Sequence, residues 1–167
     1  LARLQVDSYR SAYAGIFPQD YLDQFSYGDQ EGDWIELLTS ASPDVILVAE
    51  AGDAQPAGYA VGRTQASYDA PYDSELVSLH VRRSLQRRGI GRRLTSATAA
   101  SLAAHGCRAM MLWVLEANPA RAFYERLGAV LLDGHKRMIN AHEVAYGWPD
   151  IQAIAAAGRT SIDPGQV

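Results

Sequence analysis

The sequence is poor in cysteine and lysine and has no long apolar run. Its 167 residues include one cysteine, Cys107, which excludes an internal disulfide and favours a reducing compartment. No apolar run approaches the roughly 18–20 residues that span a bilayer, and the opening LARLQVDSYR lacks the apolar centre of a signal peptide. We therefore expect a cytoplasmic protein without a membrane partner, in which Cys107 is a buried structural thiol.

Basic residues are unevenly placed along the chain. There are 15 of them against 19 acidic residues, which gives a net charge of −4, and all but Lys136 are arginines. Many of these arginines lie between Arg82 and Arg93. A local basic patch on an acidic chain favours a compact anionic ligand over a long polyanion, so we expect no nucleic-acid partner. The simpler alternative is a solvated, arginine-rich start of a helix.

Apolar spacing and turn residues predict one domain of mixed α/β structure. Helical spacing, broken at Gly15 and Pro18, predicts up to three helices over residues 1–40, and Pro43 ends this region. Strands and helices then alternate, as in a sheet covered by helices. The domain is expected to cover residues 1–148, and the tail 149–167 is assigned to no element. In order, we expect strands at 44–50, 57–63 and 75–81, a helix at 91–105, a strand at 109–115, a helix at 118–128, and strands near 129–132 and 143–148.

The stretch QRRGIGRRL, residues 86–94, follows the strand ELVSLHV and opens the expected helix. A helix start has unpaired N–H groups and a partial positive charge, and glycine there lets phosphate oxygens reach the backbone. Gly89 and Gly91 with their flanking arginines therefore predict a pyrophosphate-binding turn. The P-loop and dinucleotide patterns do not fit, because the Lys-Ser/Thr pair of the first and the third Gly of the second are missing. In the preceding strand, simple alternation places on one face Glu75, Val77, Leu79 and Val81.

The run Q-R-R-G-I-G-R directly after an ELxxLxV strand resembles the acetyl-CoA signature of the GCN5-related N-acetyltransferases. Downstream, MLWVLEAN and ARAFYERLGA resemble the next strand and the following helix of that family, in the same order. The resemblance covers about residues 45–148. It implies a mixed, mostly antiparallel sheet, flanked by helices, in which the neighbouring parallel strands 75–81 and 109–115 splay apart. The family normally has a strand before its first helix, but this sequence opens within an apparent helix. Either that strand is lost from this sequence or the sheet is short by one edge.

The resemblance also implies which residues hold the acetyl donor, acetyl-CoA. Its pantetheine arm is expected to pair with strand backbone between the splayed strands, and its diphosphate to lie on the glycine turn. Asn118 resembles an asparagine that bonds the pantetheine, but it stands one residue closer to the following tyrosine than the family pattern, so a role as a helix cap is left open. For the imidazole of His80 we expect no chemistry. The implied donor-binding residues are Leu79, His80, Val81, Gln86, Arg87, Arg88, Gly89, Ile90, Gly91, Arg92 and Asn118, and no metal site is expected.

The reaction implied by the resemblance is attack of a primary amine on the acetyl thioester. Such an amine, with a pKa near 10, arrives mostly protonated, so a base must take its proton and an acid must protonate the departing thiolate. Tyr124, from the family's FY pair, is the expected acid, and a merely packed phenol is the alternative. Glu75 is the expected base, acting through water, with Asp73 as a nearby substitute; an ion-paired acid at the strand end is the alternative. The amide near Val81 is expected to stabilise the oxyanion.

The acceptor is not identified by the sequence. It is expected to enter opposite the donor, between the first helices and the last hairpin. An aromatic stripe at helical spacing is otherwise typical of core. The family acts on small-molecule amines and on peptide or protein amines, and self-association into a homodimer is left open. The rival reading is a CoA-binding sensor or interaction module that has lost turnover. The aromatic side chains available as walls are Tyr9, Tyr13, Phe17, Tyr21 and Tyr146.

Overall fold

The computed structural model describes residues 1–40, 45–52, 55–138 and 140–158, and its centre is a six-stranded sheet. The strand order is β1-β2-β3-β4-β6-β5, with β3 and β4 parallel and the other neighbours antiparallel. This confirms the predicted mixed, mostly antiparallel sheet. Pro43 and the chain beyond residue 158 lie outside the described residues. The strands are β1 (Val45–Glu50), β2 (Pro56–Arg63), β3 (Ser74–Val81), β4 (Met110–Leu115), β5 (Val130–Met138) and β6 (Ala141–Trp148).

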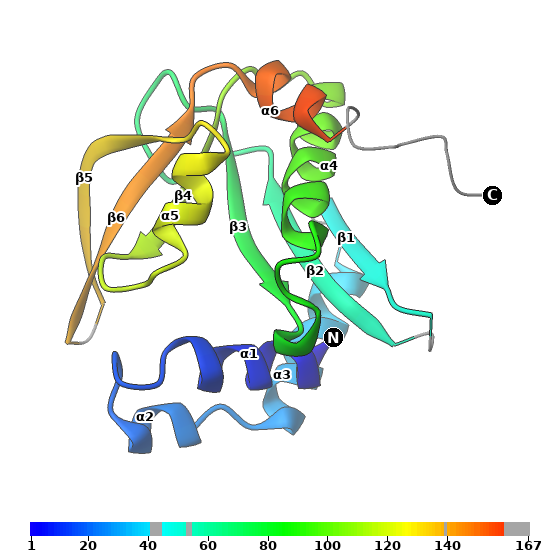
Figure 1. The fold of residues 1–167 in the computed structure, drawn as a ribbon, viewed down its shortest axis with the longest axis vertical. Coiled ribbons are helices and arrows are strands. Elements are labelled where there is room, and N and C mark those ends of the chain that lie inside the picture. The colour runs from blue at the N-terminus through cyan, green and yellow to red at the C-terminus, as the bar shows by residue number, and fades with distance from the viewer. Residues whose placement is uncertain (41–44, 53–54, 139, 159–167) are drawn as a thin grey trace.

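Helices flank the sheet, and those of the first 40 residues form a group of their own (Figure 1). Trp34 of this group meets Tyr59 of β2 edge-on, with ring centroids 4.9 Å apart. The larger hydrophobic cluster, the main core, lies between the sheet and the helix of residues 90–104. A Cβ added at Gly62 of β2 would lie 2.5 Å from Cγ2 of Thr98 in that helix, so the helix approaches the sheet closely. The helices are α1 (Ala2–Ala12), α2 (Gln19–Asp23), α3 (Tyr27–Thr39), α4 (Ile90–Ala104), α5 (Arg121–Arg126) and α6 (Ile151–Ala157), with a 3-10 turn at Arg83–Leu85.

Local capping explains where several of these helices begin and end. The hydroxyl of Ser26 accepts a hydrogen bond from the backbone N–H of Asp29 at the start of α3. Past the end of α4, Gly106 adopts a left-handed φ of 90°, which glycine tolerates without strain. Within the described residues, no helix combines the length and apolarity needed to cross a membrane.

The segment after residue 148, which the sequence left unassigned, contains the short helix α6. The Asp150 side chain accepts a hydrogen bond from the N–H of Gln152 and caps its start. Ile151 and Ile154 are fully buried in the main core, beside residues of α4. The hydrophobic core therefore continues beyond Trp148.

The parallel strands β3 and β4 are paired over a short length and then diverge. Their pairing joins Ser74 with Met110 and Glu75 with Met111, although β3 runs on to Val81 and β4 to Leu115. Figure 1 shows the two strands separating beyond this point. The predicted splay is therefore present, with Glu75 at its closed end.

A bulge in β3 overturns the predicted alternation of its side chains. The register with β2 shifts between Val61 and Gly62, so that β3 residue 77 has no partner. As a result Leu76 lies in the main core together with Leu79 and Val81. The expectation that Glu75 shares a face with Leu79 and Val81 is wrong, because the extra residue reverses the alternation between them.

The loop between β2 and β3, residues 64–73, covers the far half of the sheet. The hydroxyl of Tyr68 donates to the carbonyl of Asp133, and its ring lies against Gly134 of β5. The ring of Tyr72 packs so closely on Gly147 of β6 that a Cβ there would collide with it. This loop forms a wall over one face of β4, β5 and β6.

Candidate active site

The glycine turn after β3 forms a backbone cradle at the start of α4. Gly89 precedes the helix with a left-handed φ of 78°, and Arg87 is left-handed as well, with a φ of 64°. Alternation of right- and left-handed residues turns successive N–H groups to the same side and makes an anion-binding concavity. The N–H of Arg93 bonds the carbonyl of Gly89, so the N–H groups before it, in the first turn, are the ones left for a ligand.

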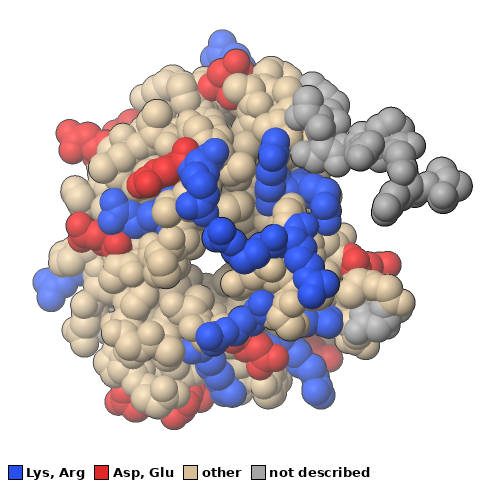
Figure 2. Space-filling model, viewed as in Figure 1, with Lys and Arg blue, Asp and Glu red and all other residues tan. Residues whose placement is uncertain are grey.

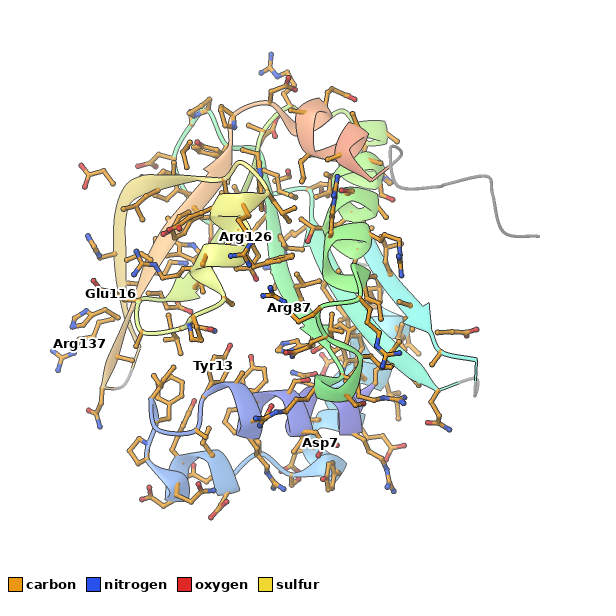
Figure 3. The ribbon with its side chains drawn as sticks, in the orientation of Figure 1. Asp7, Tyr13, Arg87, Glu116, Arg126 and Arg137 are labelled. Atoms are coloured by element: carbon orange, nitrogen blue, oxygen red, sulfur yellow. The ribbon has the colours of Figure 1, made fainter. Side chains whose placement is uncertain are left out.

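Arginines surround this turn and border a hollow in the surface. Figure 2 shows basic side chains gathered around an opening in the middle of this face. In Figure 3, Arg87 and Arg126 of α5 extend toward the same space. The guanidinium of Arg92 instead donates to the carbonyl of Ala157 at the end of α6, 2.8 Å away. Arg92 can therefore contribute its backbone N–H to the turn, while Arg87 has its charge available.

The diverging edge of β3 presents backbone groups of Leu79 and Val81. The N–H of Arg82 donates to Ala57 of β2, and because strand groups alternate in direction, those of His80 also face β2. The groups of Leu79 and Val81 then face the space between β3 and β4. Gln86 donates from Nε2 to the Val81 carbonyl at 3.2 Å, which ties the turn to this edge. Of the three predicted backbone contacts, the geometry supports Leu79 and Val81.

The side chain of His80 is a packing element between two tyrosines. Its ring centroid lies 5.3 Å from that of Tyr9 and 5.1 Å from that of Tyr59. Burial lowers the pKa of His80 to about 4, because the charged form is poorly solvated there. This agrees with the expectation that its imidazole takes no part in chemistry.

His80 should make the fold less stable in acid. The unfolded chain protonates this residue near pH 6.5 and the folded chain near 4, so unfolding takes up a proton between these values. The contribution of neutral His80 to the free energy of unfolding is fully present above pH 6.5 and is lost as the pH falls toward 4. For a pKa shift of this size the loss is at most about 3 kcal/mol. Urea unfolding at several pH values should show this loss for the native chain and not for His80→Phe. Parallel pH profiles for the two proteins would contradict the prediction.

Tyr124 belongs to α5 and lies near enough to Tyr13 to raise the pKa of that phenol. Its ring packs on Phe123 and Trp148, with centroids 5.1 and 6.4 Å away. Burial raises the pKa of Tyr124 to about 12, so the phenol stays protonated near neutral pH. Within the described part of the chain its hydroxyl makes no hydrogen bond, and it is not among the buried polar atoms that lack a partner. Among the described residues, this hydroxyl therefore has no partner of its own.

Glu75 and Asp73 differ in what their carboxylates do. Glu75 is 8% exposed, and its Oε2 accepts a hydrogen bond of 2.9 Å from the N–H of Ser67. Asp73 instead accepts bonds of 3.0 Å from the N–H groups of Arg108 and Ala109 and holds the start of β4. The structure therefore favours Glu75 as the carboxylate at the cleft and gives Asp73 a structural task.

Asn118 is engaged in a local turn before α5. Its Oδ1 accepts a 2.9 Å bond from the N–H of Ala120, and the helix proper begins at Arg121, two residues after the predicted first helical position, Pro119. The turn consumes the side-chain oxygen as a cap would. Binding of the donor by Asn118 stays a prediction, and the contact would have to come from its side-chain amide nitrogen.

Aromatic side chains of α1, α2 and their flanking turns close into a ring. Successive centroids from Tyr9 through Tyr13, Phe17, Tyr21 and Phe25 back to Tyr9 lie 4.9 to 5.7 Å apart. Figure 3 shows Tyr13 directed from the end of α1 toward the opening. The first four of these residues, predicted as walls for the acceptor, therefore form one aromatic cluster, and their contact with an acceptor stays a prediction.

Tyr146 does not belong to that wall. It lies in the main core on the opposite face of β6, where its hydroxyl donates to Glu125 of α5 and accepts from Nε of Arg121. Its even-numbered position in β6 points away from α1, together with Val144 and Trp148. The expectation that Tyr146 lines the acceptor side is wrong.

A second carboxylate at the cleft, that of Glu143, was missed by sequence reasoning. It pairs with Leu115 of β4 and with Lys136 of β5, so it lies on the face that carries Trp113. Burial raises the pKa of Glu143, nearby Lys136 lowers it, and repulsion by Glu75 raises it. Its charge also raises the pKa of Tyr9 and Tyr13. Glu143 thus faces both α1 and Glu75, and this could be read only from the strand pairing.

Comparison with known proteins identifies the family to which this fold and this site belong. The family model described as the acetyltransferase (GNAT) family matches residues 6–129. A curated relative, the uncharacterized N-acetyltransferase YuaI of Bacillus subtilis (strain 168), is 33% identical over 157 residues, which cover 92% of this chain and 88% of that protein. The chain therefore belongs to the GNAT acetyltransferase family.

Solved structures with the same fold agree with this assignment. The PaiA N-acetyltransferase of Thermoplasma acidophilum, in complex with coenzyme A, aligns with a TM-score of 0.67 at 18% identity, covering 88% of this chain and 90% of that chain. An acetyltransferase of Thermus thermophilus aligns with a TM-score of 0.63 at 24% identity, covering 89% and 90%. These likenesses confirm the fold.

Proposed function

We propose that this protein transfers the acetyl group of acetyl-CoA to a primary amine by direct attack. The observation that carries the proposal is the open edge of β3, formed by the backbone groups of Leu79 and the N–H of Val81, which leads into the N–H cradle at Gly89. Unpaired strand groups beside a core are costly unless a ligand pairs with them. Pantetheine has amides that can pair with such an edge, and its diphosphate suits the cradle.

The donor would be held by two kinds of group in this chain. Leu79 and Val81 pair with the pantetheine, and Gln86 fixes the geometry of that edge through the Val81 carbonyl. The diphosphate receives the backbone N–H groups of the turn, while Arg87 supplies charge at the rim (Figure 3). The residues of the turn that take part are Arg87, Arg88, Gly89, Ile90, Gly91 and Arg92.

The chain's acid and base complete the reaction. When bound, acetyl-CoA supplies a thioester carbonyl that an amine can attack. Glu75 removes a proton from the incoming ammonium through a water molecule, and an N–H of the β3 edge near Val81 stabilises the oxyanion. The amine nitrogen forms the new amide bond, and the carbon–sulfur bond breaks. Tyr124 gives its proton to the thiolate, and the second proton lost by the amine nitrogen restores the phenol. The products are therefore the acetylated amine, CoA and the one proton taken up through Glu75.

The proposal is tested by two glycine variants at opposite ends of α4. Gly89 and Gly106 both have left-handed φ angles, and neither position is crowded for a Cβ, so alanine should destabilise each variant by about 1 kcal/mol. Gly89→Ala should also weaken acetyl-CoA binding by about tenfold, because a methyl group and a shifted turn disturb the cradle. Gly106→Ala should bind as the native protein does.

Binding by calorimetry and CoA release over a panel of amines are the measurements. Native protein should bind acetyl-CoA and release CoA in the presence of an accepted amine. Equal binding by both glycine variants would place the donor elsewhere. Binding without release for any amine would instead favour the catalytically silent CoA-binding module, which the commitment of Asn118 to its local turn slightly favours.

A further inference from the structure

Glu143 is a half-buried carboxylate that no described residue pairs. Its position in β6 is buried in part, yet within the described residues its side chain makes no hydrogen bond and no ion pair. Partly buried carboxylates are normally paired, because losing solvent disfavours the charge. Among the described residues, a positive charge in direct contact with Glu143 is therefore missing.

The ammonium group of Lys136 is near enough to lower the pKa of Glu143 but forms no ion pair with it within the described residues. Lys136 lies across from Glu143 in the strand register, but its Nζ is 4.1 Å from the ring centroid of Trp113 and donates to Oγ of Ser67 at 3.2 Å. The indole N–H of Trp113 donates to the same oxygen at 3.0 Å. Lys136 is thus held on the wall formed by the β2–β3 loop and leaves Glu143 open to the cleft.

Glu143 and Glu75 lie on the same face of the sheet, at different levels along the strand direction. Glu75 is level with Met111 of β4, and Glu143 is level with Leu115. These two levels are four residues apart along β4, which corresponds to about 13 Å between the backbones. The two carboxylates can lie closer together than this, because each glutamate side chain can lean toward the other. The tyrosines Tyr9 and Tyr13 of α1 lie close enough to Glu143 to feel its charge.

We infer that Glu143 binds a second positive charge on the acceptor, so that the acceptor class is a flexible diamine or longer polycation. This rests on the proposed function, because it presumes that the reacting amine is placed at Glu75. One end of the acceptor loses its proton to Glu75, while the other end remains an ammonium and pairs with Glu143. Aromatic faces of the α1 ring, Tyr9 and Tyr13, border the methylene chain and add attraction for the cation.

Three acceptors of matched length test the inference on the native protein. Diaminobutane, butylamine and gamma-aminobutyrate offer the same primary amine with a positive, a neutral or a negative far end. We expect kcat/KM to fall in that order, with roughly a 10- to 100-fold advantage of diaminobutane over butylamine, the range of a hydrogen bond to a charged group. Equal kcat/KM values for diaminobutane and butylamine would overturn the inference. A higher kcat/KM for gamma-aminobutyrate would also overturn it, because the far end of the acceptor would then bind the ammonium of Lys136.

Glu143→Gln identifies the carboxylate responsible. This variant should lose the preference for diaminobutane and keep its rate with butylamine, because only the far end of the acceptor is affected. Glu36→Gln, which makes the same change of charge on the exposed surface of α3, should keep the native preference. Should Glu143→Gln fold poorly, Glu143→Asp keeps the charge and should keep the order of the three acceptors.

The outcome separates this inference from the proposed function. Turnover of all three amines at similar rates would leave acetyl transfer standing and remove Glu143 as a cation site. Absence of CoA release with every amine, while acetyl-CoA still binds, would end the proposed function and the inference together.

Discussion

Replacement of Tyr124 by phenylalanine should lower kcat by roughly 10²- to 10⁴-fold, the range that a positioned acid contributes. The departing thiolate has no other hydroxyl assigned to it in the proposed site. The KM for acetyl-CoA should stay within about threefold, because the ring and its contacts with Phe123 and Trp148 remain. Steady-state kinetics with any accepted amine measures both quantities.

The stability of this variant distinguishes an acid from a packing residue. The Tyr124 hydroxyl has no hydrogen-bond partner in the described part of the chain, so its removal should leave the free energy of unfolding within about 0.5 kcal/mol. Tyr146→Phe is the matched control. It removes the hydroxyl that bonds Glu125 and Arg121, so it should cost about 1 kcal/mol and leave kcat unchanged. Native turnover in Tyr124→Phe would remove Tyr124 as the acid.

The raised pKa of Tyr124 also determines what its titration can do. At about 12, this phenol keeps its proton across the usual assay range. An alkaline loss of activity well below that pH therefore comes from another group. The pKa of Tyr13 is also raised, chiefly by burial. Because Tyr124 and Tyr13 both stay protonated, the cleft presents phenols and not phenolates to its ligands.

Local chemistry made part of the site predictable from the sequence. Gly89 precedes α4 as expected because a helix start that exposes its N–H groups depends on neighbouring residues alone. The buried strand β4 followed from its continuous apolar run, and Tyr124 followed from a motif with fixed spacing. The order of elements and the divergence of β3 from β4 came with the family resemblance.

Features that depend on strand pairing could not be read in this way. The bulge at residue 77 of β3 is visible only in its register with β2, so alternation placed Glu75 on the wrong face. Glu143 gained its significance from Leu115 and Lys136, which are distant in the sequence. The helix α6 is short and rich in alanine, and it is stabilised by contacts with the main core more than by its own pattern.

Replacement of Glu75 by glutamine should lower kcat/KM for the acceptor by roughly 10²- to 10³-fold and flatten the acidic limb that reports the enzyme's base. Glutamine keeps a side-chain oxygen for the N–H of Ser67, so the β2–β3 loop should stay in place. A purely structural role of Glu75 would therefore leave the rate nearly intact. The pH–rate profile of kcat/KM is the measurement.

The deficit of Glu75→Gln should also shrink as the pH rises. An acceptor amine with a pKa near 10 loses its proton to solvent in alkaline buffer, and the reaction then needs the carboxylate less. Asp73→Asn is the control: it weakens the bonds to the N–H groups of Arg108 and Ala109 and lowers stability, yet should keep the native pH profile. A glutamine variant whose profile matches the native one at every pH would show that another group accepts the proton.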